Sequence, residues 1–315
     1  MDQKETIILA IESSCDDTSA AILKNNAILS NLIAGQEVHS EYGGVVPELA
    51  SRAHLQNIVP VVDAAIKNSG VKKSDIDAVA FTKGPGLLGS LVVGTSFAKS
   101  FAMAMKIPLI DVNHMYGHVL AHFIDDGEKE KPKFPFLCLT VSGGHTQIWL
   151  VKGLRDYKLM GETRDDAAGE AFDKGARILG LGYPGGPEIE MLSRKGDEKS
   201  IVFPKALMQN KNLEFSFSGI KTSLLYYIES HEVLCKEDVA ASYQAAIIDT
   251  LITKLKWAMD KTNCKTCVIA GGVAANKRLR KFVKQTIKNE KVIFPKLSLC
   301  TDNAAMIAYL GELYL

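Results

Sequence analysis

The chain has 315 residues, of which 47% are hydrophobic and 23% are charged. A chain of this length exceeds the size at which one hydrophobic core usually keeps growing, so we expect a globular protein with one large α/β unit or two packed lobes. The formal net charge is +1. This near-neutral balance excludes a global attraction to nucleic acid and leaves only a local basic patch for such contacts.

The N-terminal segment and the cysteines indicate a cytoplasmic protein. Residues MDQKETIILAIESS pass into an apolar run without the basic region, cleavage site or Arg-rich pattern of a targeting sequence. No apolar stretch reaches about 18 residues without charges or helix breakers, so no membrane span is expected. The six cysteines are sparse and irregularly spaced, as in reducing compartments. Cys264 and Cys267 form a lone CxxC pair, which we interpret as two thiols at a strand entrance.

Two segments share one pattern, an apolar run that ends in small polar residues and then resumes. They are residues 6–24 and 136–152, and each predicts a β-hairpin with a polar tip. Between them, helical and strand-like patterns alternate, which indicates an α/β fold. The helices are expected at about residues 47–68 and 90–105, and the strands near 77–82 and 107–112.

After the second hairpin the sequence predicts mainly helices. A Gly-rich helical stretch, DDAAGEAFDKGARILGLG, is followed by the turn YPGGPE and a polar segment around residues 193–218. Helices are expected near residues 218–230 and 236–261. A third apolar run from Cys267 ends in Gly-Gly and predicts a strand, a tight turn and a helix that begins near Ala275 or Asn276.

The charged segment GEKEKPK, with its helix-breaking proline, predicts a lobe boundary near residue 132. We expect an N-terminal lobe over residues 1–132 and a C-terminal lobe over residues 133–301. The last helix, residues 302–315, is expected to pack back on the first lobe.

His114 and His118 are the strongest candidates for metal ligands. Their spacing places both imidazoles on one face of a helix, where two nitrogen donors suit zinc or iron. Two surface or capped histidines would show the same spacing. His122 continues the ladder, so the third ligand is open between this histidine and Asp302, which opens the small-residue helix NAAMIA.

A zincin-type metalloprotease is disfavoured by one position. Such enzymes carry HExxH, in which a glutamate beside the first histidine is the general base. Met115 stands at that position. Peptide hydrolysis would therefore need another base.

The two hairpin tips have the composition of a phosphate grip. They are ESSCDDT (12–18) and SGGHT (142–146), whose small residues would let backbone N–H groups approach an anion. Ordinary hairpin turns have the same composition. Together with GGVAAN (271–276), however, the tips resemble the three-part pattern of the actin-like ATPase fold. Kinases and ATPases of that fold place an acid at the second tip, where this chain has Ser142 and Gly143, so Mg-dependent ATP hydrolysis is not expected.

Further motifs extend the resemblance over nearly the whole chain. They are GGVVPELASRAH (43–54), KGPGLLGSL (83–91), NHMYGH (113–118), GEAFDKGA (169–176), YPGGP (183–187) and TDNAAMIA (301–308). With the hairpin tips, these motifs closely resemble the TsaD family of tRNA adenosine threonylcarbamoyltransferases. The ESSCDDT form resembles the bacterial and organellar branch.

The resemblance implies a two-lobed actin-like α/β fold with duplicated mixed sheets and a nucleotide and metal site in the cleft between the lobes. It implies that His114, His118 and Asp302 bind one divalent metal, Fe²⁺ or Zn²⁺, and it assigns no other catalytic residue. The implied nucleotide contacts are Thr140, Val141, Ser142, Gly143, Gly144, Asp173, Gly186 and Asn276, with a ribose contact from Glu190 by analogy.

The implied reaction transfers the threonylcarbamoyl group from threonylcarbamoyl-AMP to N6 of adenosine 37 in tRNAs that read ANN codons, and releases AMP. ATP or ADP is also expected to fit the nucleotide site. The implied partners are tRNA, a TsaB-type paralogue that pairs through helices of the first lobe, a TsaE-type ATPase, and a separate synthase that supplies threonylcarbamoyl-AMP. The alternatives are a metallopeptidase, a carbohydrate kinase of the same fold and a non-catalytic scaffold.

Two further motifs each leave two interpretations open. A strongly basic segment follows Asn276 and could contact tRNA phosphates or form a solvated cationic face. Its members are Lys277, Arg278, Arg280, Lys281, Lys284 and Lys288. Gly84-Pro85-Gly86 predicts a turn that leads into a tightly packed helix, with direct substrate contact as the alternative.

Overall fold

The computed structural model describes residues 5–42, 44–125, 127, 130–233 and 235–315. The chain forms two compact units, one of Met1–Lys131 with Pro295–Leu315 and the other of Pro132–Phe294. The return to the first unit therefore begins at Pro295, earlier than the residue 302 expected from the sequence. Residues 128 and 129 of the boundary segment GEKEKPK, and Gly43 of the motif at 43–54, lie outside the described residues.

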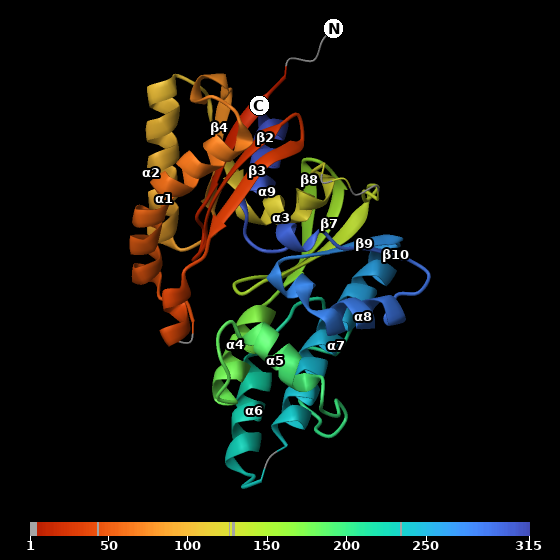
Figure 1. Ribbon diagram of the computed structural model, residues 1–315. Coiled ribbons are helices and arrows are strands. Elements are labelled where there is room, and N and C mark those ends of the chain that lie inside the picture. The colour runs from red at the N-terminus through yellow and green to blue at the C-terminus, as the bar shows by residue number, and fades with distance from the viewer. Residues whose placement is uncertain (1–4, 43, 126, 128–129, 234) are drawn as a thin grey trace. The chain divides into compact units, whose positions relative to one another are not determined.

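The first unit is built on a five-stranded mixed sheet with the order β3-β2-β1-β4-β5 (Figure 1). Its strands are β1 (Ile7–Glu12), β2 (Thr18–Lys24), β3 (Ala27–Ala34), β4 (Ala78–Gly84) and β5 (Leu109–Asn113). β1 and β2 pair antiparallel, which confirms the predicted first hairpin. β4 lies parallel to β1, and β5 lies parallel to β4. The carboxyl ends of β1, β4 and β5 therefore meet at one edge, where ligands of open α/β sheets usually bind.

Helices cover both faces of the first sheet. They are α1 (Pro47–Ser69), α2 (Leu88–Met105) and α9 (Ala304–Tyr314). Because successive side chains of a strand point to opposite faces, Leu9 and Val79 join the core under α1 and α2, whereas Ala80 faces α9. A Cβ on Gly311 of α9 would lie 2.5 Å from the Cβ of Ala80, so the helix and sheet approach closely there.

α2 is unusually apolar for a helix on the outside of a sheet. It is the one helix among the described residues that is long and apolar enough to cross a membrane, by length and composition alone. It contains Lys99, and one face packs on β4 and α1. Leu88 and Met103 are exposed on its outer side. The apolar residues of α2 therefore lie both on the face that packs against the protein and on an exposed face.

The second unit repeats the sheet of the first in the order β10-β9-β6-β7-β8. Its strands are β6 (Phe136–Val141), β7 (Thr146–Gly153), β8 (Asp156–Glu162), β9 (Thr266–Ala270) and β10 (Lys291–Ile293). β6 and β7 form the predicted second hairpin, and β9 lies parallel to β6 as β4 does to β1. Cys264 and Cys267 are buried free thiols at the start of β9, as expected.

The helices of the second unit agree with the sequence except at one segment. They are α4 (Ala168–Ile178), α5 (Gly185–Ser193), α6 (Ser218–Glu229), α7 (Lys236–Thr262) and α8 (Lys277–Thr286). The segment YPGGPE, predicted as a turn, instead opens α5. Pro184 is its N-cap and Pro187 lies in its first turn, where a proline costs no helical hydrogen bond. The Oδ1 atom of Asp173 accepts a hydrogen bond of 2.7 Å from the Gly185 N–H.

Candidate functional site

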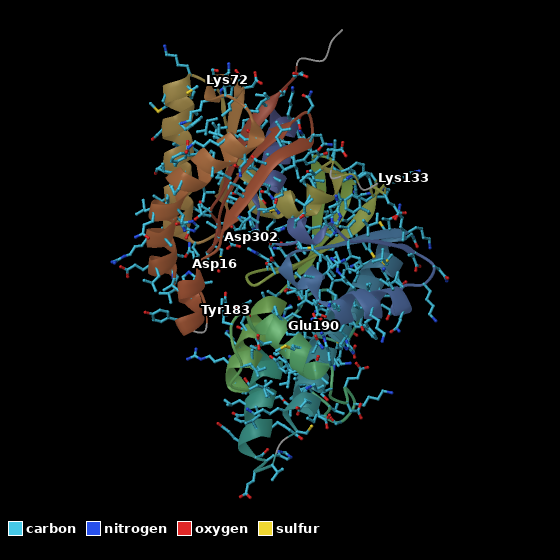
Figure 2. All side chains as sticks on the ribbon, viewed as in Figure 1. Asp16, Lys72, Lys133, Tyr183, Glu190 and Asp302 are labelled. Atoms are coloured by element: carbon cyan, nitrogen blue, oxygen red, sulfur yellow. The ribbon has the colours of Figure 1, made fainter. Side chains whose placement is uncertain are left out.

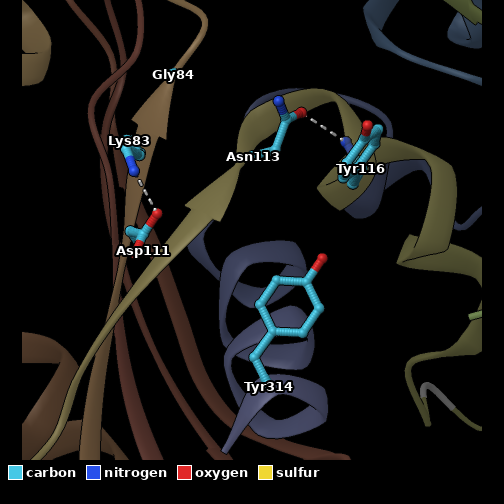
Figure 3. A pocket seen from close by; sticks show the side chains of 6 residues that line it. All are labelled: Lys83, Gly84, Asp111, Asn113, Tyr116 and Tyr314. Carbon is cyan, nitrogen blue, oxygen red and sulfur yellow. Dashed lines mark hydrogen bonds and ion pairs between the residues drawn. The ribbon is translucent and has the colours of Figure 1, made fainter. Parts of the chain in front are cut away.

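A short helix, α3 (His114–Leu120), carries the predicted histidine pair at the end of β5. Asn113 caps this helix, since its Oδ1 accepts a hydrogen bond of 3.2 Å from the N–H of Tyr116 (Figure 3). The rings of His114 and His118 lie on one face with centroids 4.8 Å apart, and both side chains are buried. The cap therefore orients the first turn of α3 and with it the first imidazole.

Asp302 joins the two histidines, although it lies far from them in the sequence. Its Oδ1 is 3.0 Å from Nε2 of His118 and 3.5 Å from Nε2 of His114. Atoms from all three side chains lie within 4.8 Å of one another, which makes them a candidate metal-binding triad. Asn303 holds the turn before α9 by donating to Thr301 O at 2.8 Å and accepting from Met306 N at 3.1 Å. His122 is buried but does not belong to the triad.

Glu12, at the end of β1, contacts the triad, whereas the sequence analysis placed it only in the first hairpin tip. Its Oε2 accepts from Nδ1 of His114 at 3.0 Å and from the hydroxyl of Thr82. Its Oε1 accepts from Ser14 N at 2.5 Å, and the side chain is fully buried. A histidine that donates from Nδ1 to a carboxylate presents Nε2 as the metal-ligating nitrogen. The signal in the sequence was a lone acid that ends the apolar run IILAIE.

The charges around His114 stabilise its protonated form when no cation is bound. Burial lowers the pKa of His114, but the carboxylates of Glu12 and Asp302 outweigh it and raise this pKa to about 9. Burial raises the pKa of Glu12, yet the charge and hydrogen bond of His114 lower it overall. Positive charge is therefore favoured at the triad, and a divalent cation would supply it in place of the proton.

The first hairpin tip differs from the phosphate grip predicted for it. It brings Glu12, Asp16 and Asp17 toward Asp302, and Figure 2 labels Asp16 and Asp302 near each other. Burial and the neighbouring carboxylates, Asp16 and Asp302 first, raise the pKa of Asp17 to about 7. Several carboxylates close together repel a phosphate and attract a cation. This tip is therefore part of the surroundings of the triad.

Two other predicted motifs hold the first tip in place. Imidazole nitrogens of His54, on α1, lie 2.7 Å from the hydroxyl of Thr18 and 2.9 Å from the carbonyl of Cys15. After Gly84-Pro85-Gly86, Leu87 donates from its N–H to Ser14 O at 2.7 Å. A Cβ on Gly86 would lie 2.5 Å from that same carbonyl, so only glycine fits. The turn leads into α2 as predicted and also supports the residues beside His114.

A pocket of about 400 Å³ lies near α3 in the first unit (Figure 3). Its lining residues are Lys83, Gly84, Asp111, Asn113, Tyr116 and Tyr314. Lys83 and Asp111 form an ion pair of 2.8 Å across exposed positions. The pocket shares no residue with the triad, and its cation and carboxylate already neutralise each other.

In the second unit, the tip between β6 and β7 exposes backbone donors. A Cβ on Gly143 or Gly144 would meet no atom within 4 Å, and neither backbone N–H donates to another group among the described residues. Ser142 O accepts a hydrogen bond of 3.1 Å from Gly169 N, which brings the start of α4 to this tip. Free amides beside a helix N-terminus suit an anion, as the sequence predicts. The side chains of Thr140 and Val141 are buried, and both residues pair with β7 in the sheet.

The remaining predicted nucleotide residues lie on α4, α5 and α8 of the second unit. Gly186 is open, with no atom within 4 Å of an added Cβ. Glu190, labelled in Figure 2, already accepts from Arg194 at 3.0 Å and from Lys277 N at 3.2 Å. A ribose hydroxyl at Glu190 would have to share these bonds.

Asn276 is likewise engaged within the protein. Its Oδ1 caps α8 by accepting from Leu279 N at 2.9 Å, and its Nδ2 donates to Gln244 at 2.8 Å. Gln244 in turn donates to Ser193 at 2.6 Å. This buried network joins α5, α7 and α8, and it depends on a glutamine inside a long helix that no sequence motif singled out.

Comparisons with known proteins agree with the predicted family. A family model described as TsaD, tRNA N6-adenosine threonylcarbamoyltransferase, matches residues 27–309. A relative of that name from Phocaeicola vulgatus is 53% identical over 322 residues, covering 98% of this chain and 93% of the relative. Another of that name, from Christiangramia forsetii, is 53% identical over 320 residues, covering 99% and 94%.

Two solved structures share the fold at low identity. Component A of the Acidaminococcus fermentans (R)-2-hydroxyglutaryl-CoA dehydratase matches with a TM-score of 0.55 and 12% identity, covering 98% of this chain and 97% of its own. HypF from T. kodakarensis matches with a TM-score of 0.66 and 14% identity, covering 98% of this chain and 48% of its own. With the repeated sheets, these matches confirm the actin-like α/β fold.

Proposed function

The chain belongs to the TsaD family of tRNA N6-adenosine threonylcarbamoyltransferases, and we propose on that premise that it catalyses the family reaction. The reaction transfers the threonylcarbamoyl group from threonylcarbamoyl-AMP to N6 of adenosine in tRNA and forms t6A. The observation that carries this proposal is a relative of that name with 53% identity over 98% of this chain. We also propose that the protein acts in the cytoplasm, as the sequence analysis expects.

The transfer balances without water or an oxidant. The lone pair of N6 attacks the carbamoyl carbon, the bond from that carbon to the phosphate oxygen of AMP breaks, and AMP leaves with the electron pair. The N6 atom loses one proton as the new bond forms, and the phosphate of the released AMP or the solvent accepts it. Because the nucleotide is a leaving group to be held, the absence of an acid at Ser142 and Gly143 is compatible with the reaction.

The triad fits a divalent metal by its donor chemistry. Two imidazoles and one carboxylate are a typical ligand set for zinc or non-haem iron, and three protein ligands leave positions open for substrate. Nδ1 of His118 is buried and makes no hydrogen bond among the described residues, so this ring owes its position to packing and to Asp302. A metal held by His114, His118 and Asp302 would supply Lewis-acid polarisation of the threonylcarbamoyl carbonyl. We propose iron or zinc as the ion.

The chain's own groups have three further roles in this proposal. Glu12 orients His114 and holds the Nδ1 proton. The free amides of Gly143 and Gly144, with the N-terminus of α4, bind the phosphate of the adenylate. The open position at Gly186 admits the nucleotide beside α5. ATP and ADP are expected to occupy the same site, because they share the adenosine and phosphate.

Glu12→Gln is expected to weaken metal binding about 10- to 100-fold, the usual cost of losing a carboxylate that orients a ligating histidine. The amide keeps the size of the side chain but removes its charge beside His114. Titration of the apoprotein with Zn²⁺ against a competing chelator measures the effect. Glu5→Gln, on an exposed acid of the same unit, is the control. Equal affinities of the two variants would contradict the role of Glu12.

The experiment that tests the proposed function follows t6A directly. Purified chain is incubated with threonylcarbamoyl-AMP and unmodified tRNA that reads ANN codons, alone and with a TsaB-type paralogue and a TsaE-type ATPase. Nuclease digestion and mass spectrometry then detect the modified nucleoside and released AMP. No t6A under any combination would refute the proposal. Cleavage of a peptide or sugar-dependent ATP turnover would favour the metallopeptidase or kinase alternative.

We propose that the paralogue binds the outer surface of α1 and α2. Leu55 and Val59 on α1 and Leu88 and Val92 on α2 are exposed, each pair one helical turn apart. The two helices cross closely, since a Cβ on Gly89 would lie 2.1 Å from the hydroxyl of Ser51. A contiguous apolar face of this kind marks a protein interface. The paralogue, the ATPase and the synthase that supplies the adenylate remain partners of the proposed reaction.

The double variant Leu55→Asp with Val92→Asp is expected to weaken binding of the TsaB-type paralogue at least about thirtyfold, because central apolar residues of an interface contribute about 2 kcal/mol or more. Sedimentation of the mixed proteins measures the dissociation constant. Val202→Asp, at a 94% exposed valine of the second unit, is the control. Unchanged association of the double variant would exclude this face.

A further inference from the structure

The outer face of α8 carries a row of lysines that the proposed chemistry does not use. They are Lys277, Lys281, Lys284 and Lys288, here called the lysine ridge. With about 100° per residue, the first three lie within a narrow arc of the helix, and the fourth follows two residues after its end. All four are exposed, whereas Leu279 and Val283 on the opposite face are buried.

The arginines of the same helix behave differently from the lysines. Arg278 donates to Glu198 at 2.9 Å and lies 3.6 Å from Asp249, and Arg280 donates to Ala274 O at 2.7 Å. These bonds engage both arginines within the protein and neutralise the acids beside the helix. The ridge lysines, in contrast, form no ion pair with any of the described residues. Their positive charges are therefore uncompensated.

The positive charge at the start of α8 interacts unfavourably with the dipole of the helix. The N-terminus of a helix is the positive end of its dipole, where acids are favoured, yet α8 begins with Lys277 and has no acid in its own first turn. The carboxylate that bonds the Lys277 N–H there, Glu190, comes from α5 and is already paired with Arg194. A helix that only needed a solvated face would carry mixed charges, as α1 does with its Glu48–Arg52 pair. The whole chain has a formal net charge of only +1, so the ridge is a local positive patch.

We propose that the lysine ridge is the surface on which the tRNA backbone docks, an inference that rests on the proposed function. Three lysines spread over about 10 Å of helix, with a fourth beyond its end, match the successive phosphates of a polyanion better than a single phosphate group. The first of them, Lys277, follows Asn276, which caps α8 and is an expected nucleotide contact. The RNA would thus approach the second unit beside the segment that is expected to hold the adenylate.

The test compares two variants of equal charge in the full reaction mixture. The ridge variant replaces all four ridge lysines by glutamine, which retains helix propensity. The control variant replaces four other exposed lysines of the second unit that form no ion pair among the described residues. They are Lys152, Lys158, Lys256 and Lys261. Each variant lowers the formal net charge by four from +1, so any general effect of charge is shared.

Binding of unmodified tRNA is measured by fluorescence anisotropy at several salt concentrations. We expect the slope of log K against log salt to fall by about three in the ridge variant, because each lost phosphate contact reduces it by about 0.7–0.9. Between about 50 and 200 mM salt, wild type should then lose roughly 50-fold more affinity than the ridge variant. The control variant should keep the wild-type slope, and both variants should bind threonylcarbamoyl-AMP as wild type does.

The outcomes separate this inference from the proposed function. An unchanged slope in the ridge variant, or an equal fall in the control variant, would overturn the ridge while t6A formation stands. A wild-type protein that forms no t6A and binds no tRNA in the full mixture would overturn the proposed function and the ridge with it.

Discussion

Replacing His114 and His118 together by alanine is expected to remove the bound metal and to reduce threonylcarbamoyl transfer on the order of a thousandfold. The two imidazoles and Asp302 form the candidate metal-binding triad, and Asp302 alone would bind a divalent ion only weakly. Lewis-acid stabilisation contributes several kcal/mol to a transition state, and about 1.4 kcal/mol corresponds to a tenfold change in rate. Elemental analysis of the purified variant and t6A formation measure the two effects.

His122 offers a matched control for this experiment. It is buried like His118 and continues the same spacing along the chain, but it does not belong to the triad. His122→Gln is therefore expected to keep the metal and most of the activity. Unchanged metal content in the double variant, or metal loss in a folded His122→Gln protein, would refute the assignment of the ligands.

Gly271→Ala is expected to destabilise the protein by about 2–6 kcal/mol and to weaken adenylate binding about tenfold. Gly271 has a φ of 90° and a ψ of 165°, a backbone region that is essentially restricted to glycine and costs another residue roughly 1–3 kcal/mol. That Cβ would also lie 2.4 Å from Val141 O, and overpacking of this kind costs about 1–3 kcal/mol. Because Val141 precedes the Ser142–Gly144 tip, relief of the clash would displace the donors for the phosphate. Thermal denaturation and calorimetric titration with AMP measure both effects.

Gly219→Ala is the control for this substitution. Gly219 lies in the first turn of α6, and a Cβ there would meet no atom within 4 Å. Its replacement by alanine should leave the free energy of unfolding equal to that of wild type or slightly higher, since alanine is the better helix former. A Gly271→Ala protein that is as stable as the Gly219→Ala protein would show that the turn after β9 tolerates a side chain.

The elements that the sequence predicted well are those stabilised by local patterns. Each hairpin shows an apolar alternation on both sides of a short polar tip, so its pairing needs no distant residue. The strands β3, β8 and β10, which were not predicted, all lie at sheet edges. Their side chains are mostly half-exposed or exposed, which weakens the alternation of apolar and polar residues. α5 was not predicted, because its prolines and glycines are typical of a turn, although proline is well tolerated in the first turn of a helix.

The sequence by itself determined the histidine pair and the open glycine tip between β6 and β7, because an i,i+4 spacing and a glycine-rich turn act over one turn of backbone. Only the tertiary structure decided what surrounds His114. Asp302 lies 184 residues from His118, and Glu12 lies 102 residues before His114. The parallel pairing of β1, β4 and β5 brings their carboxyl ends together, and α9 returns across that sheet. Such contacts depend on strand order, which no local pattern specifies. Because of them, the first tip, predicted as a phosphate grip, forms the acidic surroundings of a candidate cation site.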